Sequence, residues 1–114
     1  MVQWMRKGIA DPQFVEHPGS YLSSCRGGRV TGCALGAAYV GMIGDAHQAL
    51  IRFQKRCRDG NAILFFVTDL GITLEEAQDI DQRHTDNTST KEIIAFFEEM
   101  REYIPLKFTQ QPHP

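Results

Sequence analysis

The residues of this sequence best suited to chemistry gather around two arginines. Cys25 directly precedes Arg26, and Arg29 follows three positions later. A cysteine becomes a nucleophile when a neighbouring cation or base stabilises its thiolate. Cys25 is therefore the candidate nucleophile. His17 and His84 are candidate bases, although no spacing in the sequence brings either of them to Cys25.

The same arginines are candidates for binding an anion. The segment Gly27-Gly28-Arg29-Val30-Thr31-Gly32 has the glycine separation of a phosphate-binding loop, but Cys33-Ala34 stands where that loop needs Lys followed by Ser or Thr. This excludes a phosphate-binding loop. A looser anion site remains an alternative, formed by Arg26, Arg29 and the backbone N–H groups of a helix start near Cys33.

Metal sites need ligands at characteristic spacings, and the sequence lacks them. It contains no C-x-x-C or H-x-x-x-H pair, and Cys25 is too far from Cys33 for a zinc knuckle. The acidic residues from Asp79 onward lose the alternation of a calcium-binding loop at Arg83. We expect neither a metal nor a cofactor.

Charge and hydropathy argue against nucleic acid and membrane. The chain has 12 Lys and Arg against 14 Asp and Glu, so its formal net charge of −2 creates no overall attraction for a polyanion. A helix pair from Thr73 to Ile104 could form a helix-turn-helix, but acidic residues follow Lys91 in its second helix and would repel phosphates. No stretch reaches the ~20 apolar residues of a membrane span. We expect no nucleic-acid partner and no membrane association.

Cysteine usage and the N-terminal residues indicate the cytoplasm. The three cysteines cannot all pair within one chain, which favours reduced thiols. Residues 1–7 lack the charged-then-apolar order of a signal peptide. We therefore expect a cytoplasmic protein.

A fold must position these residues, and the uncharged stretch from Gly32 to Gly44 is its most informative part. Gly and Ala recur there at helical spacing. Such small side chains let neighbouring helix backbones approach more closely than the usual 8–10 Å between axes. We predict a buried helix from about Ala34 to Met42, with the other helices packed around it.

Apolar periodicity and capping residues predict the remaining helices. These are expected at residues 2–10, 46–58, 61–70, 73–84 and 89–104, with caps at Asp45, Asn61, Thr73 and Ser89. In the fourth of these helices, Leu74 is expected to face inward with Ala77 and Ile80. Phe14 and Val15 are expected to anchor an irregular segment in the core.

Glycines also predict a small β-hairpin near residues 21–33, because Gly27-Gly28 readily supplies the positive φ angles of a tight turn. The fold class that follows is mainly α: a single-domain bundle of five or six helices with this hairpin. The domain is expected to span residues 1–109, and residues 110–114 are expected to be a disordered tail.

A resemblance to a known family rests on three segments of the sequence: residues 5–10, Cys33-Ala34-Leu35-Gly36-Ala37-Ala38-Tyr39 and Thr90–Phe97. They resemble a family of small uncharacterised bacterial proteins with a Gly-x-Cys-Ala-Leu-Gly-Ala-Ala segment and a late Thr-Arg/Lys-Glu-x-Ile-Ala helix start. The sequence departs from that family at His84-Thr85-Asp86-Asn87, where Asn-Asp is expected. The resemblance implies one compact domain and carries no known activity.

The function expected from the sequence is a non-enzymatic protein-interaction or adaptor module, because fold determinants account for nearly every notable residue. Spare aromatic residues on helices commonly mediate self-association, so a homodimer through Trp4, Phe96 or Tyr103 is expected as one form of this interaction. The alternative is a small-ligand, anion-binding or thiol-dependent activity. It would centre on the arginines and Cys25 described above.

Overall fold

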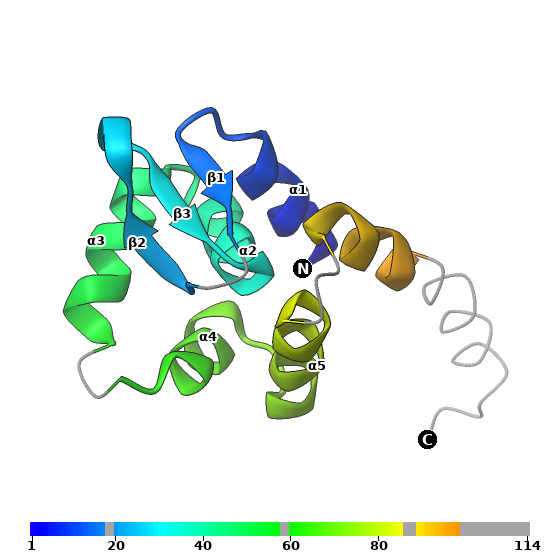
Figure 1. Ribbon diagram of the computed structural model, residues 1–114. Coiled ribbons are helices and arrows are strands. Elements are labelled where there is room, and N and C mark those ends of the chain that lie inside the picture. The colour runs from blue at the N-terminus through cyan, green and yellow to red at the C-terminus, as the bar shows by residue number, and fades with distance from the viewer. Residues whose placement is uncertain (18–19, 58–59, 86–88, 99–114) are drawn as a thin grey trace, which may run out of the picture.

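The computed structural model of this protein describes residues 1–17, 20–57, 60–85 and 89–98. This part of the chain is mainly helical, with six α-helices and a small three-stranded sheet (Figure 1). In chain order the elements are α1 (Val2–Ala10), β1 (Phe14–Glu16), β2 (Leu22–Ser24), the short 3₁₀ turn η1 (Arg26–Gly28), β3 (Val30–Gly32), α2 (Ala34–Ile43), α3 (Ala46–Arg56), α4 (Ala62–Leu70), α5 (Leu74–Thr85) and a last helix at residues 90–98. The predicted fold class is confirmed.

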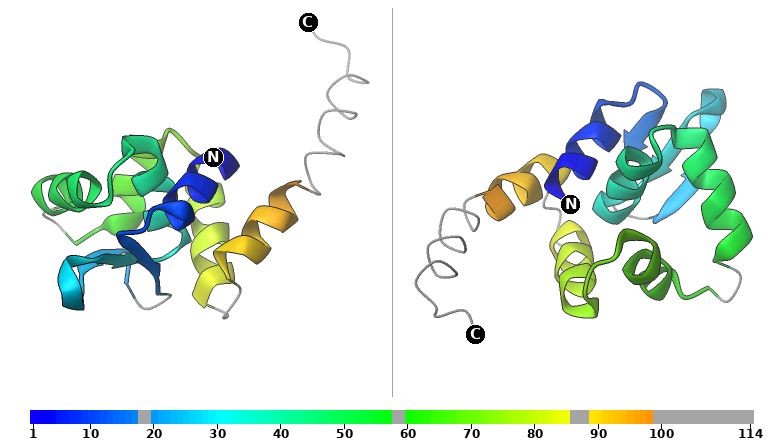
Figure 2. Two further views of the ribbon diagram at one scale, coloured as in Figure 1. Left: turned by 90° about the horizontal axis from the view of Figure 1, so that it is seen from above. Right: turned by 180° about the vertical axis from the view of Figure 1, so that it is seen from behind.

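Helix α2 forms the centre of the molecule and is buried from Ala34 to Gly41. Helix α1 lies against α2 (Figure 2), and glycines at the contact allow the two helix backbones to approach closely. A Cβ atom at Gly8 of α1 would overlap the carbonyl oxygen of Ala37, and one at Gly41 of α2 would overlap that of Trp4. The two backbones therefore touch directly, as the small-residue pattern predicts.

The predicted hairpin is present, since β2 pairs antiparallel with β3 and the turn holds Gly27 at φ 79° and Gly28 at φ 74°. The sheet also contains β1, which pairs in parallel with the other edge of β3 in the order β1-β3-β2. The expectation of an irregular segment at Phe14 and Val15 is therefore wrong. Phe14 is buried in the core as predicted, whereas Val15 is 38% exposed. A three-residue strand has no period to detect, and its parallel partner lies far along the chain.

The predicted caps explain where four helices begin. In the last helix the hydroxyl of Ser89 accepts a hydrogen bond from the N–H of Glu92 at 3.2 Å. The side chain of Asp45 accepts a hydrogen bond from the N–H of Gln48 at 2.9 Å, which caps α3. Thr73 and Glu76 exchange side-chain-to-backbone bonds of 3.1 and 3.0 Å, which is the predicted capping box of α5. Asn61 caps α4 in the same way as Asp45 caps α3.

Two details of the predicted helices are corrected. Leu74 is 45% exposed rather than buried, because it lies about 120° around the α5 axis from Ile80, which is buried. Helix α3 ends at Arg56, with Cys57 as its C-terminal cap. The predicted end of that helix at residue 58 lies outside the described residues.

The last helix packs back onto the N-terminal part of the chain. Its first N–H, that of Thr90, donates to the carboxylate of Glu16 in β1 at 2.7 Å, and Arg6 of α1 forms an ion pair with Glu98. Ile93 is fully buried. The predicted continuation of this helix to residue 104 and the tail at residues 110–114 lie outside the described residues.

Candidate functional site

The structure brings together three of the residues that the sequence singles out. Cys25, Arg26 and Arg29 lie at the turn between β2 and β3, where the N–H of Cys25 donates to the carbonyl oxygen of Arg29 at 2.9 Å. Both arginine side chains are exposed. The Cys25 thiol lies 3.8 Å from the carbonyl oxygen of Arg26, which is an acceptor and not a base that would activate it.

The helix start near Cys33 lies at the other end of β3 from this turn. Four extended residue steps separate Arg29 from Cys33, a distance of about 13 Å. The structure therefore separates the two halves of the looser anion site. Cys33 itself is buried, and burial raises the pKa of its thiol to about 11, so it is a neutral core residue at physiological pH.

The N–H of His17 donates to the carbonyl oxygen of Gly32 at 2.8 Å, at the far end of β3, so this candidate base is not brought to the turn. His84, the other candidate base, is not brought there either. Its backbone lies in α5, which Figures 1 and 2 place across the molecule from the β2–β3 turn. A different histidine contacts the turn: Nε2 of His47 in α3 hydrogen-bonds to the carbonyl oxygen of Gly28. This contact holds the turn against the first residues of α3.

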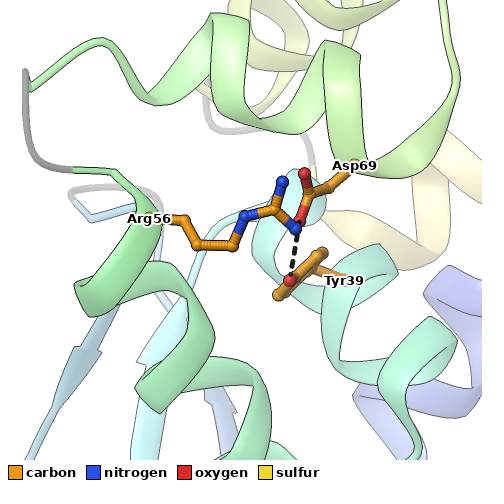
Figure 3. A network of polar contacts seen from close by, with 3 residues as sticks. All are labelled: Tyr39, Arg56 and Asp69. Carbon is orange, nitrogen blue, oxygen red and sulfur yellow. Dashed lines mark hydrogen bonds and ion pairs between the residues drawn. The ribbon is translucent and has the colours of Figure 1, made fainter.

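A polar cluster that sequence analysis missed joins α2, α3 and α4 (Figure 3). The hydroxyl of Tyr39 donates to Oδ2 of Asp69 at 3.0 Å, and Nη1 of Arg56 donates to the same oxygen at 2.9 Å. Tyr39 is fully buried, and only 6% of the Asp69 side chain is exposed. The two donors compensate the cost of burying this carboxylate.

Burial also determines how the tyrosine titrates. Desolvation, followed by the hydrogen bond to Asp69, raises the pKa of Tyr39 to about 12. The phenol therefore stays protonated and donates throughout the physiological range. This cluster joins three helices through one shared carboxylate oxygen.

A cavity of about 240 Å³ opens beside this cluster, between the end of α3 and α4. Its lining combines charged, polar and apolar side chains: Arg56, Cys57, Asn61, Leu64, Phe65, Thr68 and Asp69. Cavities that bind drug-sized ligands usually measure about 300–1,000 Å³. At about 240 Å³, this cavity falls below that range.

Exposed cations lie along α3 and on the adjoining β2–β3 turn. Helix α3 contains no Asp or Glu, and it packs against β2 and β3. We call the resulting face the α3 basic surface, and its exposed members are Arg26, Arg29, Arg52, Lys55 and Arg56.

The sequence did contain a signal for this surface. Residues 1–58 carry eight Lys and Arg against three Asp and Glu, whereas residues 59–114 carry four against eleven. The net charge of −2 therefore conceals an excess of +5 in one half and −7 in the other. Charge asymmetry of this kind points to a charged interaction surface, which the overall balance hides.

The aromatic residues expected to mediate self-association are largely engaged within the chain. Trp4 is half-buried and packs against the hydrophobic core. The guanidinium of Arg83 lies 3.7 Å from the centre of the Phe96 ring. Tyr103 lies outside the described residues.

Comparisons with known proteins find no match: no protein-family model, no curated protein and no solved structure resembles this chain. The resemblance to small bacterial proteins therefore stays a prediction. Within the described ranges, His, Cys, Asp and Glu side chains form no group of three that could hold a metal ion. No helix in those ranges is long and apolar enough to cross a membrane.

Proposed function

We propose that this protein is a non-enzymatic interaction module that binds an acidic protein segment through the α3 basic surface. The observation that supports this is the collection of five exposed cations on α3 and the adjoining turn, on a helix without a carboxylate. Opposite charge on the partner would speed encounter and orient it. A cytoplasmic location belongs to the same proposal.

The chemistry of this surface favours protein over nucleic acid. Nucleic acids bound in single strands stack on exposed aromatic rings, but the one aromatic residue of α3, Phe53, packs inward on Phe65 and Phe66. The exposed aliphatic side chain among the cations is Ile51, at 42%.

The electrostatic part of the affinity would come from several weak ion pairs rather than from one strong pair. An exposed ion pair contributes about 0.2–1 kcal/mol, and Arg56 already shares its charge with Asp69. Removing Arg52 and Lys55 together is expected to weaken binding by about tenfold, equivalent to about 1.4 kcal/mol. Binding is also expected to fall as salt rises, because exposed charges are screened.

Fluorescence anisotropy with a labelled 20-residue polyglutamate tests this proposal. A labelled 20-base-pair DNA duplex is measured in the same way and represents nucleic acid, the alternative partner. We expect salt-sensitive binding of polyglutamate that the Arg52→Gln/Lys55→Gln variant weakens about tenfold. The matched control Lys7→Gln/Lys91→Gln removes the same charge from exposed positions elsewhere and is expected to bind normally. Tighter binding to DNA, or equal loss in the control, would refute the proposal.

A further inference from the structure

The cavity between α3 and α4 adjoins the α3 basic surface, because Arg56 belongs to both. A partner segment lying on the basic surface would therefore pass over the mouth of the cavity. The cavity volume of about 240 Å³ is large enough to admit one side chain of such a segment.

The charges around the cavity exclude an acidic side chain. The carboxylate of Asp69 lines it, with Oδ2 already accepting from Tyr39 and Arg56. A second carboxylate at this depth would be repelled by Asp69 and would have to compete with it for the guanidinium. Acidic groups of the partner would stay outside, over Arg52 and Lys55.

The apolar part of the lining favours an aliphatic side chain. Leu64 is 51% exposed although it belongs to α4, a helix whose other large apolar residues are mostly buried. Leu64 and the ring of Phe65 form the apolar part of the cavity lining. A side chain that covers them would gain the burial of its own apolar surface and that of Leu64.

We infer that this cavity is the anchor subsite of the interaction and takes one aliphatic side chain from an acidic partner segment. This inference rests on the proposed function. Interfaces commonly draw most of their binding energy from such an anchor in a well-packed pocket, while charged contacts at the rim contribute less. The recognised segment is therefore an apolar residue flanked by acidic residues.

Two labelled peptides of nine residues test this inference: one has leucine at its centre and glutamate elsewhere, and the other has serine at its centre. We expect the leucine peptide to bind about 10- to 100-fold more tightly. We expect this ratio to persist at high salt, while both affinities fall. Equal affinities would overturn the inference but leave the proposed function intact, and failure of both peptides to bind would overturn both.

Substitutions locate the effect. Thr68 lines the cavity and is exposed, so Thr68→Trp is expected to fill the cavity and remove the preference for leucine without weakening the serine peptide. Leu64→Ser is expected to reduce the preference as well. The matched control is Leu74→Ser, because Leu74 is a leucine of similar exposure on α5, at 45%. A preference that survives both cavity variants, or that Leu74→Ser also removes, would contradict the inference.

An independent readout uses the cysteines. Cys57 lines the cavity, whereas Cys25 lies at the β2–β3 turn. Alkylation by iodoacetamide, mapped by mass spectrometry, is expected to slow at Cys57 when the leucine peptide is bound and to slow less with the serine peptide at equal saturation. An unchanged rate at Cys57 would place the anchor elsewhere.

Discussion

Gly8→Ala separates local helix propensity from tertiary packing, because the two predict opposite signs. Gly8 lies inside α1, and replacing a helical glycine by alanine normally stabilises a protein by about 1 kcal/mol. In this structure the added methyl group would overlap the carbonyl oxygen of Ala37. A backbone oxygen cannot move out of the way by changing rotamer, so α1 would have to shift away from α2.

The magnitude follows from that shift. Overpacking of a close contact costs about 1–3 kcal/mol, and a backbone atom places the cost in the upper part of that range. The shift would also partly expose Val2 and Met5, which are 5% and 0% exposed and whose full burial contributes about 1.5–3 kcal/mol each. After subtracting the gain in propensity, we expect a net destabilisation of about 3 kcal/mol.

Thermal unfolding followed by circular dichroism measures this effect. A loss of about 3 kcal/mol is expected to lower Tm by about 10–25 °C in a chain of this size. The control is Gln3→Ala, which lies on the exposed face of the same helix and is expected to change the free energy of unfolding by less than about 0.5 kcal/mol. A Gly8→Ala protein with an unchanged or raised Tm would refute the close contact between α1 and α2.

Three further predictions concern single groups. Tyr39→Phe removes one of the two donors to the buried Asp69 carboxylate and is expected to cost about 1–3 kcal/mol in urea unfolding. The pKa of Tyr39 is raised to about 12 in the folded state, so the contribution of its phenol to the free energy of unfolding is complete below pH 10 and is lost as pH rises from 10 to 12. The stability of the Tyr39→Phe protein is expected to lack this part of the decrease with pH. Cys33 is expected to resist a disulfide reagent at pH 8 until denaturant is added. Asp45→Ala is expected to lower the free energy of unfolding by about 1 kcal/mol, and Asp45→Asn should largely restore it.

The helices of this protein could be predicted because their signals are local. Asp45 and Gln48 are three positions apart, as are Thr73 and Glu76, so each cap forms within one turn of helix. The hairpin is equally local, since Gly27-Gly28 relieves the strain of its turn wherever the rest of the chain lies. The crowding of small residues in α2 likewise predicted a buried helix in close backbone contact.

The candidate site could be predicted only in part. Cys25, Arg26 and Arg29 are neighbours in sequence and stay together at one turn. Their expected partners do not lie at this turn, because Cys33 lies at the far end of β3 and His84 lies in α5. No rule of spacing relates positions on different elements.

Tertiary structure alone decided the features on which the proposals rest. Tyr39 and Asp69 are thirty positions apart and meet only because α2 and α4 share a core. The same packing opens the cavity beside them and leaves Leu64 half exposed at its wall. The sequence by itself determined where helices and turns begin and end, since those boundaries depend on atoms a few residues apart. The partners of each buried or charged side chain were decided only by the tertiary structure, because they depend on which distant surfaces pack together and exclude water.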